Sequence, residues 1–123
     1  MTIVNFKSFI NSVRYAASGI RYAFVHEQNF RIQIAIAAIV CALMAAFNFQ
    51  ARDVLIIGLI IALIFILELI NTVLERFLTL LEPKLQGYAK VIKDIMAGVV
   101  LIASLTALFS GIMIFWPYIR ALA

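Results

Sequence analysis

Three long apolar segments constrain the fold of this chain more than any other feature of its sequence. They cover residues 32–49, 54–74 and 95–119, and the second contains the uncharged run "IIGLIIALIFI". A helix needs about 20 apolar residues to cross the hydrocarbon core of a bilayer. The sequence therefore predicts an all-α integral membrane protein, with three transmembrane helices in a single domain over residues 1–123.

Composition supports this class and disfavours a soluble protein. Of the 123 residues, 66% are hydrophobic and only 13% are charged, whereas about half of an ordinary soluble domain is apolar. In a soluble protein the net charge of +4 would point to nucleic acid. In a membrane protein it reflects orientation and anionic lipid instead, so we expect no nucleic-acid partner. The single Cys41 cannot form an internal disulfide.

Two short polar linkers join the apolar segments. "NFQARD" connects the first to the second, and "EPKLQGYAKVIKD" connects the second to the third. The second helix is expected to continue beyond residue 74 toward Leu81. Pro83 and Gly87 are then expected to break it, because proline and glycine are the strongest interruptions of helical structure.

Residues 1–30 carry the pattern of an amphipathic helix. Apolar side chains recur at alternating steps of four and three residues, at Phe6, Ile10, Val13, Ala17, Ile20 and Phe24. A basic and polar stripe follows the same steps on another face, at Lys7, Asn11, Arg14, Ser18 and Arg21. This arrangement predicts a helix that lies in the headgroup plane of the membrane. The other interpretation, a core helix of a soluble domain, is disfavoured by the apolar segments that follow.

Basic residues are distributed unevenly between the two sides of the membrane. They gather before the first apolar segment, at Lys7, Arg14, Arg21 and Arg31, and between the second and third, at Arg76, Lys84, Lys90 and Lys93. The other linker has only Arg52, which Asp53 offsets. Because cytoplasmic loops carry the excess of lysine and arginine, the N-terminus and the 76–93 loop are predicted to lie in the cytoplasm.

Polar side chains interrupt the most hydrophobic segment. Glu68, Asn71 and Glu75 follow a spacing that places them on one face of a helix. At about 1.5 Å per residue, Glu75 reaches the cytoplasmic interface and Glu68 lies about 10 Å deeper. A carboxylate inside the membrane costs on the order of 3 kcal/mol and marks function by default. The alternative is a protonated glutamate that only packs against another helix.

Further polar groups are expected at the same depth, from segments distant in sequence. Glu27 lies just before the first apolar segment, and Lys90, Lys93 and Asp94 lie just before the third. Carboxylates that reach water can hold Mg²⁺ together with substrate phosphates, and lysines can neutralise those phosphates. A deeper carboxylate can accept a proton from a hydroxyl at the headgroup level. This combination suits the transfer of a phosphoryl group from water to a lipid.

Three motifs occur in a fixed order along the chain: "GIRYAFVHEQNFR" (19–31), "ELINTVLE" (68–75) and "KDIMAGVVLI" (93–102). In this order the chain resembles, over essentially its whole length, the small integral-membrane prokaryotic diacylglycerol kinases, which include the undecaprenol kinases. The resemblance implies ATP-dependent phosphorylation of a lipid hydroxyl in the bacterial inner membrane, with Mg²⁺ as cofactor. It also implies a homotrimer whose active sites form between neighbouring subunits. The sequence contains no Gly-rich phosphate loop.

The resemblance also implies roles for individual residues. Glu68 corresponds to the catalytic base that acts on the lipid hydroxyl, and Glu27 and Glu75 correspond to ligands of Mg²⁺. Asn71, which lies between Glu68 and Glu75 in the sequence, is expected to orient phosphate or a carboxylate. The full set expected to bind ATP is Tyr15, Glu27, Asn71, Glu75, Lys93 and Asp94.

Two positions depart from the family pattern. Thr79 stands where the family commonly has aspartate, which affects the support of the nucleotide site. Ser8 stands where an arginine often lies near the lipid headgroup, with Lys7 beside it as a substitute. Lys7, Ser8 and Glu68 are therefore the residues expected to contact the lipid substrate.

Two other functions stay open from the sequence: a small proton-coupled multidrug transporter and a structural membrane subunit. The transporter class uses a single membrane glutamate but has four spans, whereas three are predicted here. A structural subunit leaves Glu68, Asn71 and Glu75 without a reason to share a face. The lipid acceptor is also open, because diacylglycerol and undecaprenol each present one hydroxyl. The stretches "ELINT" and "KDIMAGVVLI" slightly favour undecaprenol.

Overall fold

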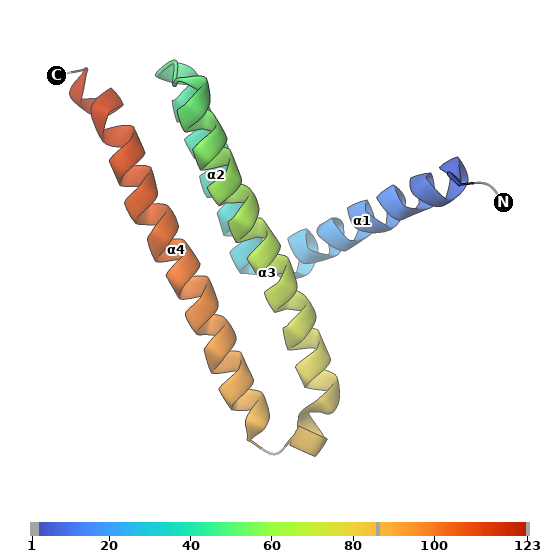
Figure 1. Ribbon diagram of the computed structural model, residues 1–123. Helices are drawn as coiled ribbons and strands as arrows, with labels where there is room; N and C mark the ends of the chain where they lie inside the picture. Colours follow the sequence, from blue (N-terminus) through green and yellow to red (C-terminus); the bar gives the residue numbers. More distant parts are fainter. Residues whose placement is uncertain (1–2, 86, 123) are drawn as a thin grey trace.

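The computed structural model describes residues 3–85 and 87–122, which form four helices. These are α1 (Phe6–His26), α2 (Gln28–Ala46), α3 (Ala51–Leu85) and α4 (Tyr88–Arg120). No strand occurs in the described residues, so the prediction of an all-α fold is confirmed. In Figure 1, α2 and α4 run alongside α3, while α1 projects from them to one side.

Three of the helices match the predicted membrane spans. α2, α3 and α4 are each long and apolar enough to cross a membrane. They contain most of the three segments that the sequence marked as spans. The fold is therefore that of a multi-pass membrane protein. α3 is its central helix, because it contacts each of the other three.

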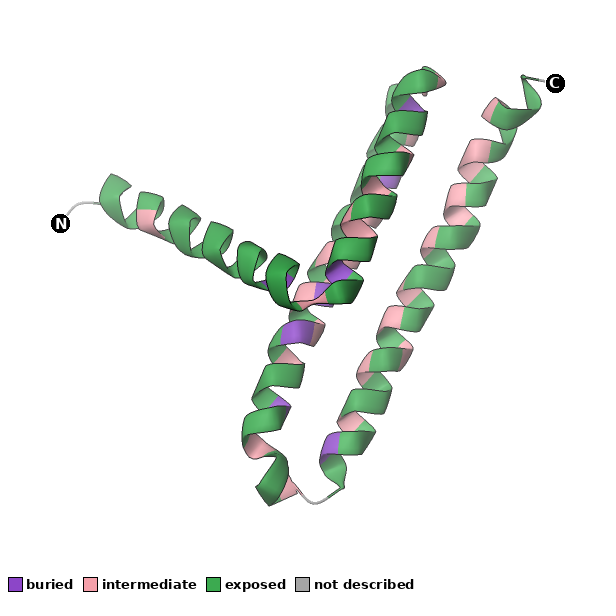
Figure 2. Ribbon diagram, turned by 180° about the vertical axis from the view of Figure 1, so that it is seen from behind, coloured by how far each residue is buried: buried purple, intermediate pink, exposed green. Residues whose placement is uncertain are grey.

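The chain by itself has only a small core. Its buried apolar side chains are Ala23, Phe30, Met44, Ile57, Leu78 and Ala89, and two polar ones, Glu68 and Thr72, are buried with them. Figure 2 shows that most of the remaining helix surface is exposed or half-buried. Because lipid tails are as apolar as leucine, such surface is tolerated in a bilayer. It faces either lipid or a neighbouring protein.

The chain turns sharply between α1 and α2 at Glu27, whose backbone is extended (φ −113°, ψ 109°). Its N–H donates to the carbonyl oxygen of Ala23 at 2.8 Å, which closes the last turn of α1. Arg31 on α2 donates from Nη1 to the carbonyl oxygens of Phe24 and Val25, both at 2.8 Å. These bonds satisfy carbonyls that the end of a helix leaves without partners. They hold α1 at its angle to α2.

The ends of the first two helices differ from the predicted ones by a few residues. The helix predicted over residues 1–30 ends at His26, and α2 begins at Gln28 instead of residue 32. α2 ends at Ala46 instead of residue 49. The reason is Asn48, whose left-handed conformation (φ 52°) is incompatible with a continuing helix.

α3 extends farther than predicted. It passes through Pro83 and ends at Leu85, so the expectation that Pro83 breaks the helix is wrong. A proline in the last turn removes one backbone donor where few hydrogen bonds follow. Gly87 does interrupt the helix as predicted, because its φ of 80° lies in the left-handed region that glycine adopts without steric cost. α4 starts directly after it, at Tyr88 instead of residue 95.

A group that we call the turn-end cluster ties the α2–α3 turn to the C-terminal part of α4; it consists of Phe49, Gln50, Asp53, Phe115 and Tyr118. The Tyr118 hydroxyl donates to Asp53 Oδ2 at 2.5 Å and accepts from the Gln50 backbone N–H at 3.0 Å. Phe49 stacks on the Tyr118 ring with 3.7 Å between centroids. Phe49 also packs against Phe115, at 4.6 Å. The hydroxyl thus has both a donor and an acceptor partner.

Candidate active site

Glu68 is a carboxylate almost fully buried in the middle of α3, with 1% of its surface exposed. Gln33 reaches it from α2, and its Nε2 donates to Glu68 Oε2 at 3.1 Å. Burying a charge without a partner is costly, so a hydrogen-bond donor at this point stabilises the carboxylate. The sequence did not predict Gln33, which is 35 residues away along the chain.

Thr72 is buried beside Glu68, one turn farther along α3. Its Oγ1 donates to the backbone oxygen of Glu68 at 3.0 Å, a bond that threonine commonly makes within its own helix. The threonine hydroxyl therefore does not donate to the Glu68 carboxylate, which accepts from Gln33 instead. The spacing of four residues indicates this neighbour from the sequence, although the sequence analysis did not single it out.

Asn71 and Glu75 lie next to each other on α3, as their spacing predicts. Asn71 Nδ2 donates to Glu75 Oε1 at 3.3 Å, which orients an otherwise exposed carboxylate. Thr79 Oγ1 donates to the backbone oxygen of Glu75 at 2.9 Å. At the position where the family commonly has aspartate, the side chain is thus turned back onto its own helix.

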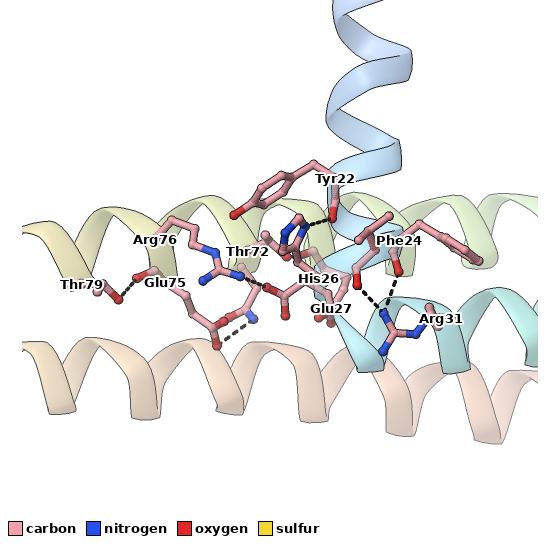
Figure 3. Close-up of polar contacts among 12 residues, drawn as sticks. Tyr22, Phe24, His26, Glu27, Arg31, Thr72, Glu75, Arg76 and Thr79 are labelled. Atoms are coloured by element: carbon pink, nitrogen blue, oxygen red, sulfur yellow. Dashed lines mark hydrogen bonds and ion pairs between the residues drawn. The ribbon is translucent and has the colours of Figure 1, made fainter.

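Glu27, at the break between α1 and α2, points toward α3. Arg76 Nη2 donates to Glu27 Oε1 at 3.2 Å, and the pair joins positions 49 residues apart in sequence (Figure 3). The Arg76 guanidinium also lies over the ring of Tyr22, 5.7 Å from its centroid. Tyr22 in turn stacks on His26, with ring centroids 4.1 Å apart.

Arg76 was interpreted from the sequence only as one of the basic charges of the 76–93 loop. The sequence does contain a sign that Arg76 lies near the site. It follows Glu75 directly and comes eight residues after Glu68, and steps of four residues keep to one helix face. The structure places it on α3, in the part of that helix that was expected to continue toward Leu81, and turns it toward Glu27. Arg76 therefore belongs to the polar groups around the candidate site.

Three carboxylates belong to the region where the α1–α2 break faces α3, which we call the polar junction: Glu27 lies at the break, and Glu68 and Glu75 lie two turns apart on α3. Arg76, the residue after Glu75, joins Glu27 to this part of α3. Among the described residues no group of three His, Cys, Asp or Glu side chains is arranged to hold a metal ion. Mg²⁺, however, usually takes one or two carboxylates and completes its shell with phosphate oxygens and water. Glu27 and Glu75 fit such a site only together with a nucleotide.

Lys93 and Asp94 lie farther along the bundle than the sequence predicted. Lys93 Nζ is 3.7 Å from Glu82, and Asp94 pairs with Lys90 at 2.7 Å. Glu82 is seven residues beyond Glu75 on α3, a distance of about 10 Å along the helix. Within one chain these groups therefore form a second polar layer, beyond the depth of Glu75.

The three expected site residues on α1 lie apart from Glu68 in a single chain. Lys7 and Ser8 are in the first turn of α1, where the Ser8 N–H donates to Asn5 Oδ1 at 3.3 Å and begins the helix. That end of α1 points away from the other helices (Figure 1). Tyr15 is exposed midway along the same helix.

An apolar groove of about 630 Å³ runs between α2, α3 and α4. α2 and α4 do not pack against each other in the described structure, and α3, which contacts both, lies between them. The groove is lined almost entirely by aliphatic and aromatic side chains, such as Phe65 and Trp116. Its few polar lining groups include Gln33, which connects it to Glu68.

The sequence profile of prokaryotic diacylglycerol kinases matches residues 14–115, which is most of the chain. The protein belongs to the prokaryotic diacylglycerol kinase family. The resemblance inferred from the three motifs is therefore confirmed.

Individual relatives carry two different names within this family. A diacylglycerol kinase of Synechocystis sp. is 37% identical over 81% of this chain and 58% of its own length. An undecaprenol kinase of Bacillus subtilis is 33% identical over 91% of this chain and 88% of its own length. A diacylglycerol kinase of Helicobacter pylori is 31% identical, over 93% and 82%. The chain thus spans little more than half of the Synechocystis protein. No solved structure matches it.

Proposed function

We propose that this protein transfers the γ-phosphoryl group of ATP to the hydroxyl of a membrane lipid at the cytoplasmic interface. The observation that carries this proposal is the buried Glu68, hydrogen-bonded to Gln33 beside an apolar groove, with Glu75 two turns farther along the same helix. The names of the relatives, diacylglycerol kinase and undecaprenol kinase, support it. They favour a kinase over the transporter and the structural subunit.

In this proposal Glu68 is the general base. A lipid whose hydrocarbon lies along apolar helix surface brings its hydroxyl to the level of the polar junction. Glu68 accepts the proton of that hydroxyl as the oxygen attacks phosphorus. Because the transition state of phosphoryl transfer is loose, positioning and charge neutralisation matter as much as the base.

The nucleotide end of the site is built from the exposed carboxylates. Glu27 and Glu75 would hold Mg²⁺ together with ATP, and a bound ion would supply charge neutralisation for the transferring phosphoryl group. Asn71 keeps the Glu75 carboxylate oriented. Glu27 is paired with Arg76 in the free chain, so holding the ion would require Glu27 to release this partner. The Arg76 guanidinium would then be free to face phosphate oxygens, which guanidinium groups bind well.

The active protein is a homotrimer in the inner membrane, with sites shared between subunits. A single chain places Lys93 beside Glu82 and Asp94 beside Lys90, and neighbouring chains supply the nucleotide contacts of Tyr15, Lys93 and Asp94. α1 lies on the cytoplasmic membrane surface, where Lys7 and Ser8 meet lipid headgroups. Glu75 is exposed in the single chain, which supports association, since polar membrane residues are normally turned toward protein.

The test of this function uses purified protein in lipid nanodiscs with ATP labelled in the γ-phosphoryl group. Either diacylglycerol or undecaprenol is added, and labelled lipid phosphate is counted with and without Mg²⁺. We expect Mg²⁺-dependent labelling of at least one acceptor by a particle with the mass of three subunits. A folded trimer that labels neither lipid would refute the kinase proposal. An active monomer would refute the shared sites while leaving the chemistry in place.

A further inference from the structure

The contact between Gln33 and Glu68 uses only half of the Gln33 amide. Nε2 donates to Glu68, whereas Oε1 is buried and has no hydrogen-bond partner among the described residues. Buried polar atoms are paired in the great majority of cases, and an unpaired one is destabilising. The free acceptor sits on the same planar group that holds the proposed base.

Gln33 is well placed to control the Glu68 carboxylate. The nearby Thr72 hydroxyl is bonded to the backbone oxygen of Glu68, and Arg76 is engaged by Glu27. An amide N–H donates to the ionised carboxylate, which is the form that can accept a proton. Among the described residues, Gln33 is thus the side chain that orients the Glu68 carboxyl group.

The same amide can also serve Glu68 after the reaction. Once Glu68 has taken a proton, its carboxyl group carries an O–H donor that needs an acceptor. The last torsion angle of glutamine is broad and roughly two-fold, so half a turn exchanges Nε2 and Oε1. The Oε1 atom, unpaired before the turn, then accepts from the new O–H. Both protonation states of Glu68 are satisfied in this way.

The groove explains why such control is needed at this point. Gln33 lines the apolar groove and also touches Glu68. It therefore stands between the hydrocarbon environment and the base that a lipid hydroxyl has to reach. In an environment with little water, the protein itself has to supply the hydrogen-bond partners that water would otherwise provide.

We propose that Gln33 is a positioning residue for Glu68, whose amide donates to the carboxylate before phosphoryl transfer and accepts from the carboxylic acid after it. The inference rests on the lipid kinase function proposed above. In the step itself, the lipid oxygen bonds to the γ-phosphorus while the bond from that phosphorus to the ADP oxygen breaks. The hydroxyl proton moves to Glu68, which later releases it to water.

The first test replaces Gln33 by methionine, which keeps the length of the side chain and removes both hydrogen-bonding groups. We expect kcat for lipid phosphorylation to fall about ten- to a hundredfold, the size of one lost hydrogen bond to a charged group. KM for ATP should stay unchanged, because the nucleotide is held elsewhere. Gln50→Met is the matched control, since Gln50 is exposed just before the start of α3 and only its backbone N–H is hydrogen-bonded to Tyr118. That variant should keep wild-type kcat.

The second test asks whether Gln33 acts through Glu68. In protein that already carries Glu68→Gln, adding Gln33→Met should cause no further loss of kcat, because the group it positions is gone. Gln33→Leu repeats the comparison with a different shape. Methionine and leucine are both less polar than glutamine, so membrane insertion is not hindered.

The outcomes separate this inference from the function on which it rests. Wild-type kcat in Gln33→Met, or an equal loss in both backgrounds, would show that Gln33 does not position Glu68. A wild-type protein without lipid kinase activity, or Glu68→Gln with wild-type kcat, would instead overturn the proposed function. A large loss in the wild-type background and none in Glu68→Gln is the result expected here.

Discussion

The start and the middle of the central helix α3 differ in how fully their polar groups are paired. In the turn-end cluster, at the start of α3, the Tyr118 hydroxyl donates to Asp53 and accepts from the Gln50 backbone. Around Glu68, in the middle of α3, the Gln33 carbonyl oxygen has no partner in the described part of the chain. The first region is complete within a single chain, and the second keeps unused hydrogen-bonding capacity.

The difference in pairing distinguishes groups that hold the helices together from groups that serve the proposed reaction. Folded proteins pair their buried polar groups, and departures from that rule concentrate at functional sites. The turn-end cluster therefore fixes the position of α4 against the α2–α3 turn. The carboxylates Glu27, Glu68 and Glu75 instead serve the proposed chemistry, and each is held by a single polar partner: Arg76, Gln33 and Asn71 respectively. Substitutions in the two regions should affect different measured quantities.

The largest contrast is expected between Glu68→Gln and Asp53→Asn. Glu68→Gln keeps the shape but cannot take a proton, so kcat should fall about 10²–10⁴-fold, with KM for ATP nearly unchanged. Asp53→Asn keeps an acceptor for Tyr118 and should leave kcat as it is. Steady-state lipid phosphorylation measures both. A Glu68→Gln trimer with wild-type kcat would show that this glutamate only packs against its neighbours and is not the catalytic base.

The next effect concerns Mg²⁺ and the exposed carboxylates. Glu27→Gln and Glu75→Gln each remove a hard anionic ligand, so the affinity for ATP in the presence of Mg²⁺ should fall about ten- to a hundredfold. Nucleotide binding titrated at several Mg²⁺ concentrations measures this, with Asp53→Asn as the matched carboxylate control. Unchanged ATP affinity and unchanged Mg²⁺ dependence in both variants would contradict the metal assignment.

A smaller effect, on stability alone, is expected at the start of α3. Tyr118→Phe keeps the stacked ring but removes the hydroxyl that links Asp53 to the Gln50 backbone. The free energy of unfolding should fall, because Asp53 and the Gln50 N–H both lose this hydrogen-bond partner. Unfolding by SDS in mixed micelles measures it. A large loss of kcat in the folded variant would show that the start and the middle of α3 are coupled.

The smallest effect is expected for the ion pair between Arg76 and Glu27, because the Arg76 side chain is half exposed. A double-mutant cycle with Arg76→Gln and Glu27→Gln should give a coupling of about 0.2–1 kcal/mol in unfolding, as for other solvent-exposed pairs. A coupling well above that range would show that this pair stabilises the fold, as the turn-end cluster does.

Much of the fold was predictable because it depends on local pattern. The length of each apolar segment indicated three membrane helices, and α2, α3 and α4 are those helices. The spacing of Asn71 and Glu75 predicted neighbours on one face, and they are hydrogen-bonded. The helix ends were less predictable. Pro83 lies within the last turn of α3, where a proline costs too little to stop the helix.

The sequence by itself determined the class of protein, its family motifs and the neighbours within each helix, since these follow from the period of the α-helix. Only the tertiary structure decided that Gln33 meets Glu68 across 35 residues and that Arg76 meets Glu27 across 49. It also placed Lys93 beside Glu82 and not at the depth of Glu75, because α4 begins directly after Gly87. Contacts between helices depend on the angle and register at which the helices pack, and no local pattern in the chain encodes these.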